Sequence, residues 1–193
     1  MPQFEYNFDD AILELDEGEI VRTVYTRPLN EGRLRDFCNK HGIVNYLPLR
    51  KVRQLKRVVS KGKTYQYQSI VLRPMFPNYI FVKMKPAQRT LLFQSGASVR
   101  ILGDQSALAN RLIDEIRLVR RVETIAMDEE LEFNTGIKEG DKFLIESGPW
   151  QGIYGWLKKK RKRSLWTIEI ECVNTLVQAT IDPTQYMMTP VEN

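Results

Sequence analysis

The chain has 193 residues, of which 42% are hydrophobic and 27% charged, and its formal net charge is +5. This composition is typical of a globular protein with one large or two small domains, and it excludes disordered and collagen-like classes. The charge is segregated. Residues 1–19 hold acids without any Lys or Arg, residues 50–73 hold eight bases without any acid, and residues 158–163 are all basic. Such segregation indicates contact with polyanions at two places.

The inventory of reactive side chains argues against an enzyme. There is one histidine, and the two cysteines, Cys38 and Cys172, lie far apart. They form neither a disulfide framework nor a metal cluster, and no paired-carboxylate motif accompanies them. We therefore expect no catalysis, no cofactor and no metal. The N-terminus lacks a basic-then-apolar signal, and no apolar run approaches the ~20 residues of a membrane span, so we expect a cytoplasmic protein.

A poorly ordered acidic lead-in is expected over 1–18, with the alternative that Asp9, Asp10 and the cluster Ile12-Leu13-Leu15 dock it on the body. A first domain is expected over 19–121. In chain order, β-branched runs, helical spacing and Gly or Pro breakers predict alternating strands and helices. The pattern indicates an α+β sandwich. Strands are expected at 20–26, 43–49, 76–82 and 99–102, and helices at 31–41, 86–95 and over Leu108 to Val119. A basic hairpin is expected at 52–72, with its turn at 60–63.

An acidic stretch without periodicity, 122–136, is interpreted as a linker. The second domain, expected over 137–190, is all β. Apolar residues alternate with polar ones from Trp166 to Cys172 and from Val177 to Asp182. Short alternating strands with turn signals predict a small β-barrel that is constitutively β.

Three glycines, Gly148, Gly152 and Gly155, fall within eight residues of this domain. They predict tight turns with positive φ or close backbone approach. The segment does not resemble a phosphate-binding loop, because no Gly-Lys-Ser/Thr follows.

In this context the stretch from Gly140 to Met188 resembles a KOW domain of the NusG family, through Gly140-Asp141, Gly148-Pro149-Trp150 and Asp182-Pro183-Thr184-Gln185-Tyr186. The first domain resembles the NusG N-terminal domain through Pro74-Met75-Phe76-Pro77-Asn78-Tyr79-Ile80-Phe81-Val82. The Trp-Tyr pair usual in the family is replaced by Val21-Arg22. The Phe76–Val82 run is more similar to specialised paralogues of the RfaH, UpxY or LoaP kind than to housekeeping NusG.

The resemblance implies a site for RNA polymerase. An apolar concavity of the first domain would receive the clamp helices of the largest polymerase subunit. A weaker correspondence places Thr90 against the gate loop. The alternative for the aromatic residues is that they belong to the core. The concavity residues carried over by position are Tyr25, Phe76, Tyr79 and Phe81.

Three basic groups are candidates for nucleic-acid contact. Arg33, Lys40 and His41 match the surface that would meet the non-template DNA strand; the alternative is a solvated helix face, with His41 as a helix-end contact. The six consecutive bases at 158–163 repel one another because they carry the same charge. This repulsion favours RNA contact at that segment over a solvated turn or a localisation signal. The hairpin at 50–63 either embraces DNA phosphates or is an edge hairpin protected by charge. The consecutive bases are Lys158, Lys159, Lys160, Arg161, Lys162 and Arg163.

The function expected from the resemblance is transcription elongation or antitermination by a monomer. The first domain would bind RNA polymerase, and the second would bind nascent RNA, Rho or a small-subunit ribosomal protein. The alternatives are a ribosome-associated or RNA-structural KOW protein without polymerase contact, and a basic-hairpin nuclease.

Overall fold

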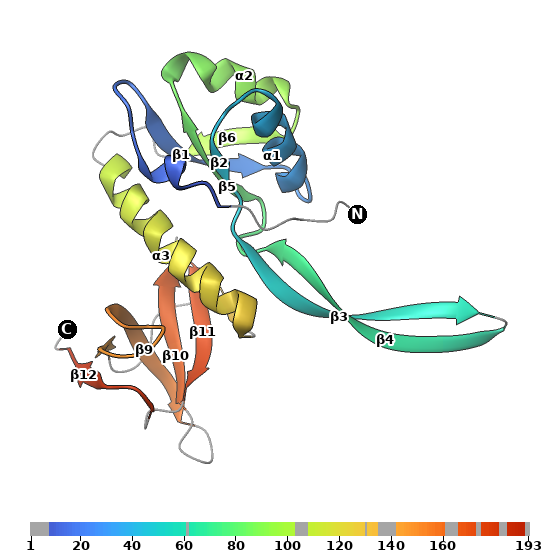
Figure 1. Ribbon diagram of the computed structural model, residues 1–193, viewed down its shortest axis with the longest axis vertical. Coiled ribbons are helices and arrows are strands. Elements are labelled where there is room, and N and C mark those ends of the chain that lie inside the picture. Colours follow the sequence, from blue (N-terminus) through green and yellow to red (C-terminus); the bar gives the residue numbers. More distant parts are fainter. Residues whose placement is uncertain are drawn as a thin grey trace. The chain divides into compact units, whose positions relative to one another are not determined.

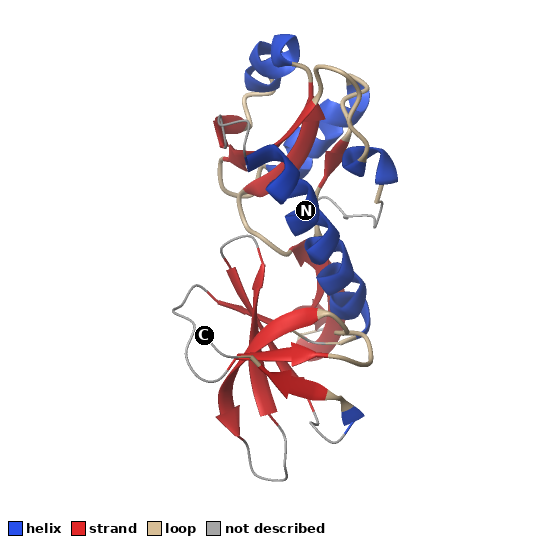
Figure 2. Cartoon of the chain, turned by 90° about the vertical axis from the view of Figure 1, so that its left-hand side faces the viewer, coloured by secondary structure: helices blue, strands red, loops and turns tan. Residues whose placement is uncertain are grey.

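The computed structural model describes residues 8–60, 62–102, 108–129, 131–134, 142–160, 166–172, 175–181 and 185–191. The chain divides into two compact units, Met1–Met127 (unit 1) and Asp128–Asn193 (unit 2). Unit 1 mixes helices with strands, and the described part of unit 2 is built almost wholly of strands (Figures 1 and 2). This confirms the α+β fold class expected from the sequence.

A four-stranded antiparallel sheet organises unit 1. Its order is β2 (Asn45–Tyr46), β5 (Tyr79–Met84), β1 (Ile20–Thr26) and β6 (Ser98–Leu102). β1 is central and carries Val21, Val24 and Thr23, which suit a buried pleated strand. Since β1 and β5 are buried on both faces, the sheet must be covered from two sides.

One face of the sheet packs against two helices, α1 (Glu31–Lys40) and α2 (Arg89–Gln94). Leu34 and Cys38 are four residues apart on α1, so they point to the same side and reach the core together. Burial raises the pKa of the Cys38 thiol to about 12. Val24, Ile80, Val82 and Met84 supply the sheet's part of this core, and Leu92 that of α2.

Helix α3 (Leu108–Asp128) is attached to the other side by a buried carboxylate. Glu123 accepts hydrogen bonds from the Tyr46 hydroxyl (2.7 Å), the Leu49 backbone N–H (2.7 Å) and Arg120 Nη1 (3.0 Å). The Tyr46 ring stacks on Phe81, with ring centroids 6.0 Å apart. Burial raises the pKa of Glu123 above its ordinary 4.5, and these three donors partly oppose that shift.

A long hairpin, β3 (Leu49–Ser60) and β4 (Lys63–Pro74), forms a sheet of its own and projects from the rest of unit 1 (Figure 1). Its register is regular from Leu49 opposite Pro74 to Ser60 opposite Lys63. From Arg53 outward, nearly all of its described residues are exposed. The hairpin expected from the sequence is confirmed, and each strand is longer than the pattern indicated.

Unit 2 is a six-stranded antiparallel sheet in the order β12-β8-β9-β10-β11-β7. Trp150 and Ile145 are buried with Val177, Ala179 and Ile181, which alternate along β11. The strand predicted at 166–172 is therefore confirmed, and so is the alternation over 177–181. The strands are β7 (Glu132–Asn134), β8 (Lys142–Ile145), β9 (Ile153–Lys160), β10 (Trp166–Cys172), β11 (Thr175–Ile181) and β12 (Met188–Pro190).

The expected linker at 122–136 is wrong over most of its length. α3 continues to Asp128, and Glu132–Asn134 pairs with β11. The acidic composition misled the interpretation, because Glu123 is a buried acceptor in unit 1 and not a solvated linker residue.

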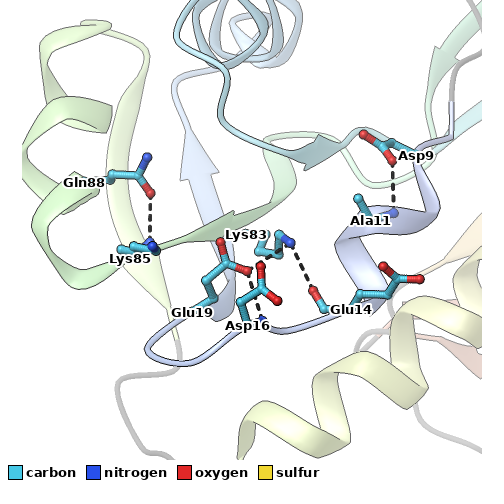
Figure 3. Close-up of polar contacts among 8 residues, drawn as sticks. All are labelled: Asp9, Ala11, Glu14, Asp16, Glu19, Lys83, Lys85 and Gln88. Carbon is cyan, nitrogen blue, oxygen red and sulfur yellow. Dashed lines mark hydrogen bonds and ion pairs between the residues drawn. The ribbon is translucent and has the colours of Figure 1, made fainter.

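The acidic lead-in is folded onto unit 1 from residue 8. Ile12, in the short helix η1 (Asp10–Leu13), is fully buried, and the Phe8 ring meets Tyr46 edge to face at 4.7 Å. Lys83 Nζ donates to the Glu14 carbonyl (3.0 Å) and pairs with Glu19 Oε2 at 3.0 Å (Figure 3). The hydrogen bond from Lys83 lowers the pKa of Glu19, so part of the acidic charge is neutralised within the fold.

Candidate functional site

Tyr25 and Tyr79 form the accessible part of the predicted aromatic site. They are directly opposite each other in the β1–β5 register, with ring centroids 5.4 Å apart and planes inclined by 58°. Both residues are half-buried. Arg100, which is exposed, lies opposite Tyr25 on the neighbouring strand β6. The result is a tyrosine pair with a cation beside it, on the sheet face that also carries Phe81.

The structure places the other two aromatic candidates in the core. Phe81 is fully buried against Tyr46, and Phe76 is 3% exposed. Alternation along β5 correctly puts Tyr79 and Phe81 on one face, but alternation alone cannot tell how far along the strand that face is covered. A buried ring cannot touch a partner, so of the four aromatic candidates Tyr25 and Tyr79 are the accessible ones.

Thr90 is exposed in the first turn of α2. Leu92, two residues later in the same helix, is buried in the core on the Val24 face of the sheet and so fixes α2 to that face. Tyr25 and Tyr79 lie on the opposite face, so the structure does not bring Thr90 together with the tyrosine pair.

The basic candidates of α1 lie on its outer side. Arg33 and Lys40 are exposed, whereas Leu34 and Cys38 face the core. The Arg33 guanidinium lies beside Gly96, where an added Cβ would be 3.5 Å from Nη2. His41 follows the last turn of α1, and its ring lies 4.3 Å from that of Phe37, as expected for a helix-end contact.

The first three bases of the cluster belong to a strand of unit 2. Lys158, Lys159 and Lys160 end β9, and Lys160 is paired with Trp166 at the start of β10. The backbone therefore places these three lysines in the paired part of the β9–β10 hairpin. Arg161, Lys162 and Arg163 lie outside the described residues.

The glycine turn between β8 and β9 has a structural explanation. Gly148 and Gly152 have φ of 74° and 75°, a region that L side chains rarely adopt. At Gly148 an added Cβ would lie 2.7 Å from Cε1 of Tyr186. Gly155 pairs with Phe143 within the β8–β9 ladder and is buried.

Among the described residues, no group of three or more His, Cys, Asp or Glu side chains is placed to hold a metal ion. Likewise, no helix among the described residues is long and apolar enough to cross a membrane.

The Glu123 network and the Lys83 anchor were missed by sequence reasoning. The only sequence signal for the hydrogen bonds to Glu123 was a lone acid on the apolar side of a helical pattern. The only signal for the contacts of Lys83 with the N-terminal segment was Ile12, an apolar residue among acidic ones.

Comparisons with known proteins agree with this architecture. The chain is similar to the Thermotoga maritima NusG structure reported under "Domain interaction in Thermotoga maritima NusG", with a TM-score of 0.51, 15% identity, and coverage of 87% of this chain and 96% of that one. It also matches a chain of the MjSpt4:Spt5 complex at a TM-score of 0.29 and 16% identity, over 90% and 99% of the two chains. A comparison with curated proteins finds no match.

The comparison with protein families settles the membership. The family described as NusG, "Transcription termination factor nusG", matches residues 22–119. That match covers more than half of the chain and nearly all of the sheet of unit 1, and the likeness to Thermotoga maritima NusG supports the fold. The chain therefore belongs to the NusG family of transcription factors.

Proposed function

We propose that this protein is a transcription elongation or antitermination factor that binds RNA polymerase through the tyrosine face of unit 1. The observation that carries the proposal is the Tyr25–Tyr79 pair, two adjacent aromatic rings that remain accessible on the sheet face on which Phe81 is buried. Paired aromatic side chains are typical anchors for a partner helix laid into a groove. Arg100 beside the pair adds a cation that suits an acidic residue on that helix.

The proposed partner is the pair of clamp helices of the largest polymerase subunit. By binding the elongating state better than the paused one, the factor would shift polymerase toward elongation. The sequence of β5 and the residues before it supports assignment to the specialised RfaH, UpxY or LoaP kind of paralogue. In this proposal α1 presents Arg33, Lys40 and His41 to the non-template strand.

The test measures binding of the full-length chain to core RNA polymerase by biolayer interferometry. Tyr79→Ala should weaken binding by about thirtyfold, the size of a truncated aromatic hot spot of ~2 kcal/mol. Tyr154→Ala is the matched control, because Tyr154 is also an exposed tyrosine but belongs to unit 2. Unchanged affinity in a folded Tyr25→Ala/Tyr79→Ala variant would refute this surface. Capture of ribosomal subunits without any polymerase would favour the alternative of a ribosome-associated protein.

Unit 2 is proposed to bind nascent RNA through the Lys158–Arg163 cluster, or alternatively Rho or a small-subunit ribosomal protein. Its first three bases, Lys158, Lys159 and Lys160, end β9 next to the pairing with β10. If four of them contact phosphates of single-stranded RNA, log K should fall with log salt at a slope near roughly −3. Replacing Lys159, Lys160 and Arg161 by Ser should flatten that slope by about two units. An unchanged slope would identify the cluster as a solvated turn.

A further inference from the structure

Two tyrosines on the projecting hairpin, Tyr65 and Tyr67, are exposed. Tyr65 and Tyr67 are alternate residues of β4, so both point to the same face of the hairpin. Their exposures are 53% and 49%. Because the outer residues of β4 are exposed, neither ring contributes to the core formed by the described residues.

Cations share that face. The register places Lys56 opposite Tyr67, and Lys63 lies two residues before Tyr65, so both lysines point to the tyrosine side. Both are exposed. Since residues 50–73 contain no acid, nothing along the hairpin's own sequence neutralises them.

Protection of a sheet edge explains only half of this arrangement. Lysines on an exposed strand prevent edge-to-edge association, which accounts for the charge. This protection does not account for aromatic rings among the lysines, because the most exposed apolar residues of the hairpin, Leu55, Val59 and Ile70, are aliphatic and lie on the opposite face. The combination of aromatic rings and lysines on one face points to a ligand.

Aromatic rings between cations match unpaired nucleotides. Bases stack on aromatic side chains while lysines contact the phosphates on either side. The Cα atoms of Tyr65 and Tyr67 are about 7 Å apart along an extended strand, about twice the ~3.4 Å separation of bases in a duplex strand. Rings at this spacing suit unstacked bases of a single strand. In a duplex the faces of the bases are stacked on one another and are not accessible to the rings.

We propose that the face formed by Lys56, Lys63, Tyr65 and Tyr67 binds single-stranded RNA. Two unpaired bases stack on the two rings, and the lysine ammonium groups contact the flanking phosphates. The tyrosine hydroxyls and the exposed Ser60 on the same face offer partners for ribose 2′-hydroxyls, which favours RNA over DNA. This site is separate from the cluster in unit 2 and does not depend on polymerase binding.

The test uses the full chain in which Lys159, Lys160 and Arg161 are Ser, so that the unit 2 cluster does not mask the hairpin. The probe is a fluorescein-labelled, unstructured RNA of about 12 nucleotides, followed by anisotropy. Tyr65→Leu/Tyr67→Leu should weaken binding by at least about tenfold, since leucine keeps the apolar area but cannot stack. Leu55→Ala/Ile70→Ala is the matched control, because these residues are exposed on the opposite face, and it should stay within about twofold.

Three further measurements decide the ligand. Lys56→Gln/Lys63→Gln should flatten the salt slope by about 1.4 units, or two phosphates at ~0.7 each. Cross-links from 4-thiouridine RNA should map to residues 64–72. Tighter binding of single-stranded or duplex DNA than of RNA of the same sequence would overturn the proposal, as would unchanged RNA affinity in the double tyrosine variant.

Discussion

Replacing Glu123 tests how helix α3 is held to unit 1. Glu123→Ala leaves the Tyr46 hydroxyl and the Leu49 N–H without their acceptor, and both residues are almost fully buried. An unsatisfied buried donor costs about 1–3 kcal/mol. Removing the buried carboxylate also removes its unfavourable desolvation, which offsets part of the cost of the two unsatisfied donors. We therefore expect unit 1 to lose about 2–4 kcal/mol of unfolding free energy.

Glu123→Gln separates hydrogen bonding from charge. Its carbonyl can still accept from the Leu49 N–H, and its amide can donate to the Tyr46 hydroxyl, so we expect a loss of only about 1 kcal/mol. The raised pKa of Glu123 sets the sign of the pH dependence. Protonation of Glu123 adds to the free energy of unfolding, and this contribution is fully present below pH 4.5. The contribution is lost as pH rises through the raised pKa of Glu123 in the folded state. The stability advantage of the native chain over Glu123→Gln should therefore grow as pH falls toward 4.5.

The assay can follow the two units separately in urea. All three tryptophans, Trp150, Trp156 and Trp166, belong to unit 2, so tryptophan fluorescence reports that unit, and far-UV circular dichroism together with Cys38 alkylation reports unit 1. Two-state analysis is applied to each transition by itself. A loss below about 0.5 kcal/mol in Glu123→Ala, within the range of ordinary surface substitutions, or equal losses in the Ala and Gln variants, would refute the reasoning.

Three further predictions follow from described contacts. Gly148→Ala should destabilise unit 2 more than Gly152→Ala, because both need positive φ but only Gly148 meets the Tyr186 ring; equal tryptophan-detected midpoints would contradict this. In a Cys172→Ser chain, Cys38 should resist iodoacetamide until unit 1 unfolds, since a pKa raised from 9.0 to about 12 makes its thiolate roughly a thousandfold rarer; rapid labelling of the native chain would disprove it. The Glu19–Lys83 contact should stabilise the docked lead-in above pH 4.5 and be lost as pH falls through the lowered pKa of Glu19. Limited proteolysis of residues 8–19 measures this, and Glu19→Gln should abolish the pH dependence.

The sequence predicted local elements well where a single pattern decides them. β1 matches its expected bounds, α1 differs by one residue, and the hairpin turn falls where Gly62 allows it. The failures involve partners that are distant in the chain. Whether Phe81 is surface or core depends on Tyr46 and α3, and whether Glu123 is linker or anchor depends on Leu49, 74 residues away. The basic patches could be found from composition, but the exposed Tyr65–Tyr67 face emerged only from the register of β3 and β4.

The length of the hairpin sets how far its tip lies from the four-stranded sheet. Twelve residues per strand carry its tip about 40 Å from the sheet at ~3.4 Å per residue. Side chains alternate with a period of two, so shortening each strand by two residues would draw the tip inward by about 7 Å and keep its face. Shortening each strand by one residue would instead turn the tyrosines to the opposite side. Reach and orientation can thus be altered independently by small paired deletions, leaving the fold of unit 1 intact.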